Sequence, residues 1–511
     1  KNNTNTVWGY APERGEILVS PTRPTEVTPV GGTVPISWGA LDKLYQGGWK
    51  NTTITNNYVS FFATFAYSLK DRYVFNANIR SDASNRFGQD ANKQFDPTYS
   101  LGVSWRMAEE EFVKAHLSWL NQLNIRATYG VQGNVVTSVS QDLITQYQGI
   151  LSGYNEYYLT ISSLPNPLLK WERTKTWNLG LDLQLFNGIT MSLEYYGRRS
   201  NAIINQDIAQ EYGMNTMRLN GGRIHNHGLE YSMNITPYQR KDFAWTIGFN
   251  ASKNWNKTQN DDIRTKADKI TKSDFISGSS DRFLKKGYPL SAFWSYSFAG
   301  LDPETGYPTF NLIDFEEADP DIDPTTFLVY SGQKDPYFTG GVNTRVRYKS
   351  LSLGVDFSVL LGAKKRLPNP YANFNYGKLP APYHNLSKDL LKRWQKPGDE
   401  KHTIYPALYT SVEDVYNIQL PDGTQSNSIY SMWANSDAMV VNASFLRCNQ
   451  ISVSWNMPPR ICSKFGATNC SISANLNNPF VIGSNRFNGF DPELGDSVMP
   501  KIFSCGLSVG F

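Results

Sequence analysis

The stretch K-I-F-S-C-G-L-S-V-G-F, residues 501–511, decides the fold of this chain. Its apolar residues, from Phe503 to Phe511, alternate with serine and glycine, so one face of an extended strand is apolar and the other is small or polar. At an exposed edge of a soluble sheet, such a strand favours aggregation. A closed membrane barrel needs such strands, because their apolar side chains face lipid and the others face the lumen. The stretch therefore predicts a transmembrane β-barrel.

The same alternation recurs along the chain. In 174–186, Trp177 and Leu179 alternate with Asn178 and Gly180, and the pattern continues beyond them. Several such segments reach the 9–11 residues that a tilted membrane strand requires. The sequence is therefore expected to be all-β and antiparallel, with about fifteen strands at 58–69, 72–82, 98–107, 123–133, 174–186, 189–204, 223–236, 243–256, 289–300, 306–314, 337–349, 351–362, 445–457, 469–478 and 501–511.

Short and long connections alternate between these segments. Asn187–Gly188 is a strong two-residue hairpin signal, and a short helix is expected within 109–122. Outer-membrane barrels have short periplasmic turns and long extracellular loops. If the last strand ends at the periplasm, residues 1–57 are an extracellular loop region leading into the barrel of 58–511. Short turns are then expected near 70–71, 187–188, 237–242, 302–306 and 349–350, and long loops near 83–97, 134–173, 205–222, 257–288, 315–336, 363–444 and 479–500.

Composition narrows the class further. Aromatic residues are 14% of the 511 residues, and charged residues are only 18%, below the roughly 25% of ordinary soluble domains. Polar loops and interfacial aromatic girdles fit this mixture. A net charge of +4 without a basic, aromatic-rich cluster gives no reason to expect a nucleic-acid partner. We recognise no nucleophile, base and orienting group, so an enzyme is not expected.

Several ordered segments resemble the motifs of SusC-like TonB-dependent outer-membrane transporters. The first three are R-S-D-A-S-N-R-F-G at 80–88, L-N-I-R-A-T-Y-G-V-Q-G-N at 123–134, and N-P-L-L-K-W-E-R-T-K-T-W-N-L-G-L-D at 166–182. Four more follow in the family's order: G-L-D-P-E-T-G-Y-P-T-F at 300–310, R-W-Q-K-P-G-D at 393–399, S-F-L-R-C-N-Q-I-S-V-S-W at 444–455 and G-F-D-P-E at 489–493. Any one segment is weak, but their order is specific.

This resemblance implies a barrel of about 22 strands occluded by a plug, in the outer membrane of a Gram-negative bacterium. It implies TonB-dependent uptake of oligosaccharides or peptides, with a SusD-like surface lipoprotein as a lid. The terminal aromatic, Phe511, is similar to the outer-membrane assembly signal of such barrels. No plug or TonB box is found here, and about seven strands are lacking. We therefore expect the plug and the remaining strands to belong to a separate chain, since lipid does not tolerate unpaired strand edges.

Aromatic residues of the long loops are candidates for contact with substrate or with the lid, because aromatic faces stack on sugars and anchor interfaces. Burial within the loops or a position in the aromatic girdle is the alternative for most of them, and only a few are expected to touch substrate. Polar side chains at strand ends or on the non-lipid face are candidates for the lumen, although a structural network is the alternative for them. The aromatic candidates are Tyr154, Tyr157, Tyr158, Tyr371, Phe374, Tyr376, Trp394 and Trp433, and the luminal candidates are Arg80, Asp82, Arg86 and Asp182.

Two further features allow alternatives. Cys462 and Cys470 flank a short connection and could form a disulfide in an oxidising compartment, but two unpaired thiols fit equally well. The acidic stretch from Asp314 to Asp323 could hold Ca²⁺, although a solvated loop is favoured because its spacing is not that of an EF-hand. No other cofactor is expected.

Two other functions remain open at this point. A passive porin-like or structural barrel would conduct without energy, and a surface glycan-binding adhesin would need no channel. Fold alone does not choose among these functions.

Overall fold

The computed structural model describes a large part of the chain. Its described residues are 2–7, 10–11, 16–17, 49–54, 57–84, 95–134, 143–151, 153–154, 156–166, 168–186, 188–208, 210–214, 216–259, 286–311, 328–372, 386–408, 418–419, 425–426 and 429–511.

The contacts divide the chain into two compact units, one of Lys1–Phe61 with Ser81–Asp96 and one of Phe62–Arg80 with Pro97–Phe511. In the first unit, β1 (Asn2–Val7) pairs with β4 (Trp49–Ile54), and β2 (Tyr10–Ala11) pairs with β3 (Glu16–Ile17), both antiparallel. The expectation that residues 1–57 form an extracellular loop region stays a prediction.

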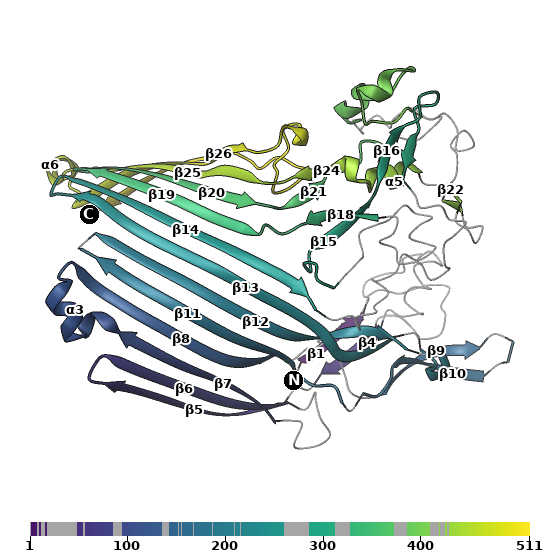
Figure 1. The fold of residues 1–511 in the computed structure, drawn as a ribbon, viewed down its shortest axis with the longest axis horizontal. Coiled ribbons are helices and arrows are strands. Elements are labelled where there is room, and N and C mark those ends of the chain that lie inside the picture. Colours follow the sequence, from purple (N-terminus) through teal and green to yellow (C-terminus); the bar gives the residue numbers. More distant parts are fainter. Residues whose placement is uncertain are drawn as a thin grey trace. The chain divides into compact units, whose positions relative to one another are not determined.

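The main feature of the described residues is one sheet of 13 strands, in which successive strands of the sheet lie side by side (Figure 1). All its pairings from β7 to β27 are antiparallel. The prediction of an all-β antiparallel chain is confirmed. The strands are β5 (Tyr58–Leu69), β6 (Tyr73–Ser84), β7 (Phe95–Arg106), β8 (Leu120–Asn134), β11 (Glu172–Leu185), β12 (Ile189–Asp207), β13 (Thr216–Gln239), β14 (Phe243–Thr258), β19 (Phe338–Tyr348), β20 (Leu351–Leu361), β25 (Phe445–Asn456), β26 (Asn469–Ile482) and β27 (Ile502–Gly510).

One face of this sheet is apolar and exposed. The register pairs Leu353 with Val453 and Ile472 with Leu507, so apolar side chains adjoin one another from strand to strand. Phe503 and Leu507 in β27 expose 69% and 70% of their surface. An apolar face this wide is unfavourable in water and favourable against lipid, which is the arrangement of a barrel wall.

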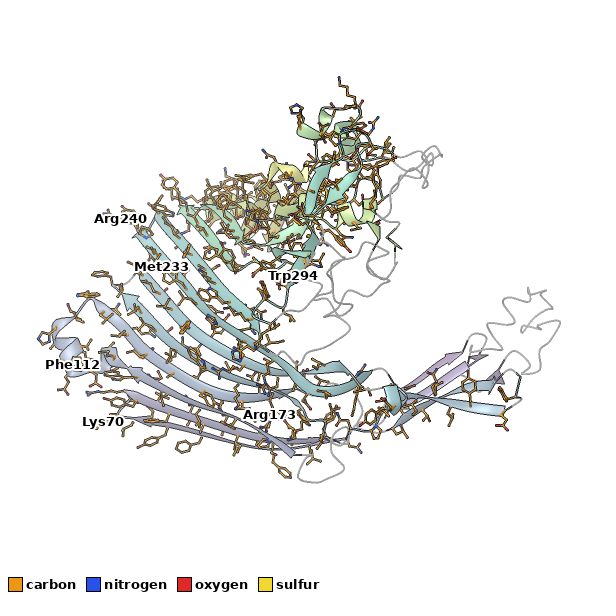
Figure 2. The ribbon with its side chains drawn as sticks, turned by 45° about the vertical axis from the view of Figure 1, so that its right-hand side comes forward. Lys70, Phe112, Arg173, Met233, Arg240 and Trp294 are labelled. Carbon is orange, nitrogen blue, oxygen red and sulfur yellow. The ribbon has the colours of Figure 1, made fainter. Side chains whose placement is uncertain are left out.

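Short connections lie at one end of the sheet and long ones at the other (Figure 1). Lys70 and Asp71, which join β5 to β6, have φ of 52° and 53°, the left-handed pair typical of a type I′ hairpin. The short end also holds α3 (Glu111–His116) and α6 (Pro459–Cys462), which agrees with the helix expected within 109–122. Figure 2 shows Lys70 and Arg240 at this end and Trp294 at the other.

The prediction of about fifteen wall strands is wrong by two. Segment 289–300 forms β15 (Ala292–Tyr296) and β16 (Phe298–Leu301), which pair with β18 (Leu328–Gln333) and β17 (Pro308–Phe310) outside the sheet. All five residues of β15 are buried, whereas a wall strand has one exposed face. The turn at 302–306 therefore joins β16 to β17 and is not a turn at the short end. Removing two strands leaves the direction of every other strand unchanged.

The long connections β14–β19, β20–β25 and β26–β27 pack together, and we call their described residues the cap. The cap contains β21 (Lys364–Arg366), which pairs with β24 (Val440–Asn442), and the helix α5 (Ile429–Ala434). A further hairpin, β9 (Ile144–Leu151) with β10 (Glu156–Ser163), lies in the connection β8–β11. Among the described residues, no helix has the length and apolar character required to span a membrane.

The remaining short elements are β22 (Ile418–Gln419), β23 (Gln425–Ser426), η1 (Met107–Glu109), η2 (Gln210–Tyr212), η5 (Lys388–Lys392), η6 (Asp399–Lys401), η7 (Asp437–Met439), η8 (Ser463–Phe465) and η9 (Asn485–Phe487).

Candidate functional site

Three of the predicted contact aromatics form the core of the cap. Trp433 is 0% exposed, and its indole Nε1 donates to the carbonyl of Ile404 at 2.8 Å. The ring of Tyr371 meets that of Trp433 edge-on, with centroids 5.4 Å apart, and its hydroxyl donates to the carbonyl of Pro406 at 2.6 Å. Burial raises the pKa of Tyr371 far above its ordinary value. Tyr371 and Trp433 therefore hold the loops together, and the prediction that they contact ligand is wrong.

Trp394 is also buried, because it packs on the hairpin β16–β17. A β-carbon at Gly306 would lie 2.3 Å from Cδ2 of Trp394, so only glycine fits beneath the indole. Leu301 and Ala407 complete this small cluster. The motif at 300–310 and the motif at 393–399 thus meet each other, and for Trp394 the prediction of ligand contact is wrong as well.

The other aromatic candidates are less buried or outside the described residues. Tyr154, in the turn between β9 and β10, is 76% exposed, and Tyr158 in β10 is 37% exposed. The side chain of Tyr157 and the whole of Phe374 and Tyr376 lie outside the described residues. For these five residues, contact with substrate or lid stays a prediction.

Asp182 belongs to a charged network on the face of the sheet opposite to the apolar one. Arg126 in β8 donates from Nε to Asp182 at 2.8 Å and from Nη2 to Glu194 in β12 at 2.8 Å. Ser192 donates to Asp182, and Asn178 donates to Glu194, each at 2.9 Å. The guanidinium lies across Gly180, where a β-carbon would be 3.1 Å away. The network ties three neighbouring strands together on this polar face, and a luminal role for Asp182 stays a prediction.

Sequence reasoning missed Arg126 and Glu194, although Arg126 lies in a quoted motif. The signal was the register, since Arg126 is directly opposite Gly180 and Gly180 is directly opposite Glu194. Arg80 and Asp82 lie in β6 at period two, and Thr98 donates to the carbonyl of Arg80 at 3.3 Å. Arg86 lies outside the described residues. A luminal role for Arg80, Asp82 and Arg86 stays a prediction.

A second ion pair joins the wall to the cap. Arg447 in β25 donates to both carboxylate oxygens of Asp491, at 2.8 and 2.7 Å, and to Glu493 at 2.9 Å. The side chains of Arg447 and Asp491 are only 5% and 3% exposed. Burial alone would raise the pKa of Asp491, but hydrogen bonds from Arg447 and from the Glu493 amide outweigh it and lower the pKa. The motifs at 444–455 and 489–493 therefore contact each other through this ion pair.

Cys462 and Cys470 are free thiols in this structure, and they do not form the disulfide that was one of the two alternatives. Both are buried and pack with Ala467 and Met457 near the short end of the sheet. In the described part of the chain, no three His, Cys, Asp or Glu side chains gather as metal ligands would. The acidic stretch from Asp314 to Asp323 falls outside the described residues, so Ca²⁺ binding there stays a prediction.

The described residues of the cap line two adjoining cavities. The larger, of about 610 Å³, lies between β21, the end of α5 and the connection β26–β27. The smaller, of about 460 Å³, lies between 386–389 and 486–490. Leu367, Pro368 and Asn369 line both cavities, so the two adjoin each other. They are the concave surfaces through which the cap can hold a small ligand.

Comparison with known proteins gives a consistent result. A family model described as TonB dependent receptor-like, beta-barrel matches residues 10–358. TonB-dependent receptor SusC of Bacteroides thetaiotaomicron is 28% identical over 482 residues, which cover 89% of this chain and 44% of that protein. TonB-dependent receptor P3 of Formosa agariphila is 24% identical, over 85% of this chain and 42% of that protein.

Among solved structures, the RagAB peptide importer in its closed-closed state aligns with a TM-score of 0.70 at 23% identity, over 91% of this chain and 48% of that chain. This likeness shows the fold. The chain spans about half the length of the relatives that it matches.

Proposed function

Because the chain belongs to the TonB-dependent receptor-like β-barrel family, we propose that it forms part of an outer-membrane importer of oligosaccharides or peptides. TonB would supply the energy for uptake, and the substrate would pass unchanged. The family is one of outer-membrane receptors rather than enzymes, and the chain is a component of the outer membrane.

One observation carries this proposal most directly: in the part of the chain that the structure describes, the strands of a wall with a lipid-facing surface carry a large folded cap at the end with the long connections. A passive pore needs an open mouth. Here three long connections form a packed core around Trp433 and leave two adjoining cavities. A structure of this kind at the entrance suits capture of a ligand before transport.

A SusD-like lipoprotein is the partner that we propose for the cap side. TonB-dependent receptor SusC is 28% identical to this chain over 482 residues, which supports a partner of the same kind. The exposed hairpin β9–β10, with Tyr154 at its tip, offers an aromatic contact for such a lid. RagAB is a peptide importer by name, so peptides and oligosaccharides are both retained as substrate classes.

The test uses the bacterium that encodes the chain. Uptake of fluorescent oligosaccharide and peptide pools would be compared in the parent strain, in a strain lacking this chain and in a strain with inactive TonB. If the chain belongs to a TonB-dependent importer, uptake of at least one pool should fall to background in both altered strains. Uptake that persists without TonB but needs this chain would favour a passive pore instead. Binding to cells without any uptake would favour an adhesin.

A further inference from the structure

The larger cavity of the cap is strongly cationic. Lys334, Lys364, Lys365 and Arg366 line it, and Asp496 is the acidic residue of its lining. Four positive charges against one negative charge leave a net charge of +3 on the lining. A concave surface lined by one sign of charge focuses the field and attracts ligands of opposite charge.

Arg366 fixes one wall of this cavity. Its guanidinium donates to Asn435 Oδ1 and to Ser295 Oγ, each at 3.1 Å, and lies 5.3 Å from the ring centroid of Phe293. Phe293 is 1% exposed. The cap core therefore holds the Arg366 guanidinium in one position. Because this side chain is already ordered, less conformational entropy is lost when a ligand binds.

The three lysines are not neutralised within the described structure. Lys365 contacts the main-chain carbonyl of Glu493, while the carboxylate of Glu493 accepts from Arg447 at 2.9 Å. Among described residues, none of Lys334, Lys364 and Lys365 forms an ion pair with an acidic side chain. Like charges placed together repel one another, so an anionic ligand would relieve this repulsion.

The backbone makes room for one of these lysines. Gly332 has a φ of +116°, and a β-carbon there would lie 2.6 Å from Cγ of Lys364. Any other residue would strain the backbone and displace the lysine stem. Beside the charges, Phe293 and the 44% exposed Leu494 give the cavity an apolar wall. The cavity therefore offers cations next to an apolar surface.

We propose that this cavity binds a carboxylate group of the imported ligand, so that the receptor prefers acidic oligomers to neutral ones of equal length. This inference rests on the proposed function only in that the bound ligand is taken to be one that is imported. Binding of an acidic ligand in the cavity can be tested separately from import. The residues that carry the selectivity are Lys334 and Lys364, while Arg366 and Lys365 also maintain the structure around it.

The experiment uses the complete receptor, purified in detergent with its partners, and isothermal titration calorimetry. Tetragalacturonate is compared with maltotetraose, and a tetraglutamate peptide with a tetraglutamine peptide. We expect one acidic probe to bind at least tenfold more tightly than its neutral counterpart in 50 mM NaCl, with a smaller ratio in 300 mM NaCl. The arm that shows the preference identifies the source of the carboxylate.

The decisive variant is Lys334→Gln/Lys364→Gln, which should remove the preference and leave neutral binding unchanged. The control Lys396→Gln/Lys401→Gln makes the same change of charge at two exposed lysines of the cap outside both cavities, and it should keep the preference. Equal binding of acidic and neutral probes overturns the inference. So does a preference that survives the decisive variant, or the absence of binding by both acidic probes.

Failure of this inference is distinguishable from failure of the proposed function. TonB-dependent uptake of neutral oligomers without any acidic preference would leave import standing and remove the carboxylate site. An acidic probe that binds through Lys334 and Lys364, in a receptor whose uptake does not depend on TonB, would confirm the site and contradict energised import.

Discussion

The indole of Trp394 lies directly on Gly306, a glycine in the left-handed region with φ of +70°. The two residues are far apart in the sequence, and their contact joins the connection β14–β19 to the connection β20–β25. Both the backbone angle and the space beneath the ring require glycine. This contact therefore gives a sharp test of how the cap is held together.

Gly306→Ala should loosen the cap. The new β-carbon would lie 2.3 Å from Cδ2 of Trp394, which adds overpacking of about 1–3 kcal/mol to the backbone strain of about 1 kcal/mol. Limited proteolysis of the purified receptor should then cut the cap loops faster. Gly398→Ala is the matched control, because φ there is +103° but no atom lies within 4 Å of the new β-carbon. Equal cleavage of both variants would show that strain alone matters.

The pair Arg447–Asp491 should make the stability of the cap depend on pH. The folded pKa of Asp491 lies below its ordinary value. Its contribution is therefore complete above the unfolded pKa, near 3.9, and is lost as pH falls through the folded pKa. Melting temperatures of the detergent-solubilised receptor between pH 2.5 and 7 should fall at the acidic end, and Asp491→Asn should flatten this part of the curve.

Removal of Arg447 should cost more than removal of both charges. Arg447→Met leaves Asp491 buried without its cation, which costs about 3–5 kcal/mol, whereas replacing both partners by apolar residues is often close to neutral. The double variant Arg447→Met/Asp491→Leu should therefore melt at a higher temperature than Arg447→Met. A double variant that melts lower still would contradict this account of the pair.

The network around Arg126 should contribute little to stability despite its short hydrogen bonds. Arg126, Asp182 and Glu194 keep 36%, 27% and 28% of their side-chain surface exposed, so water screens the pairs. We expect Arg126→Met to destabilise the wall by about 1 kcal/mol, and Glu194→Gln to restore part of the loss in that background because it removes one of two facing carboxylates. Melting curves check this, with the exposed Arg199→Met as the control. A loss above about 3 kcal/mol would show that the network is not screened.

Phe511 should matter for assembly rather than for the folded state. It is 87% exposed, so deleting it removes little packing. The family resemblance implies that the terminal aromatic is the signal for insertion, and its deletion should lower the amount of receptor in the outer-membrane fraction several-fold. Phe503→Ala removes another exposed aromatic, 69% exposed, from strand β27 and should have a smaller effect. Equal amounts of both variants would assign the loss to the lipid face instead.

The wall was predictable from the sequence because each of its strands has one face in lipid and one towards the lumen. The alternation of apolar residues such as Leu353, Phe503 and Leu507 with polar ones indicates which face lies in lipid. The short turns were predictable from residues such as Lys70 and Asp71, which lie between two alternating segments. The motifs at 444–455 and 489–493 were recognised as separate segments. That Arg447 and Asp491 are partners required the structure, since nothing local in either motif indicates the other.

The cap was not predictable in the same way. β15 was taken for a wall strand, although its five buried residues face protein on both sides. An aromatic residue in a long loop has the same local sequence whether it packs or binds. Trp394 and Trp433 were therefore candidates for contact with substrate or lid as well as for burial. The cavity at Lys364 depends on residues from three connections that no local pattern brings together.

The composition of the cap from three connections also has a consequence for the order of assembly. Its core joins Tyr307, Trp433 and Phe487, which are separated by long stretches of chain, and closing such loops is entropically unfavourable until their ends are held near each other. The ends of these loops come together at one end of the sheet when six of its strands have paired, namely β14, β19, β20, β25, β26 and β27. The cap should accordingly form late, after these six strands have paired. Formation of the cap would then indicate that the strands are in register.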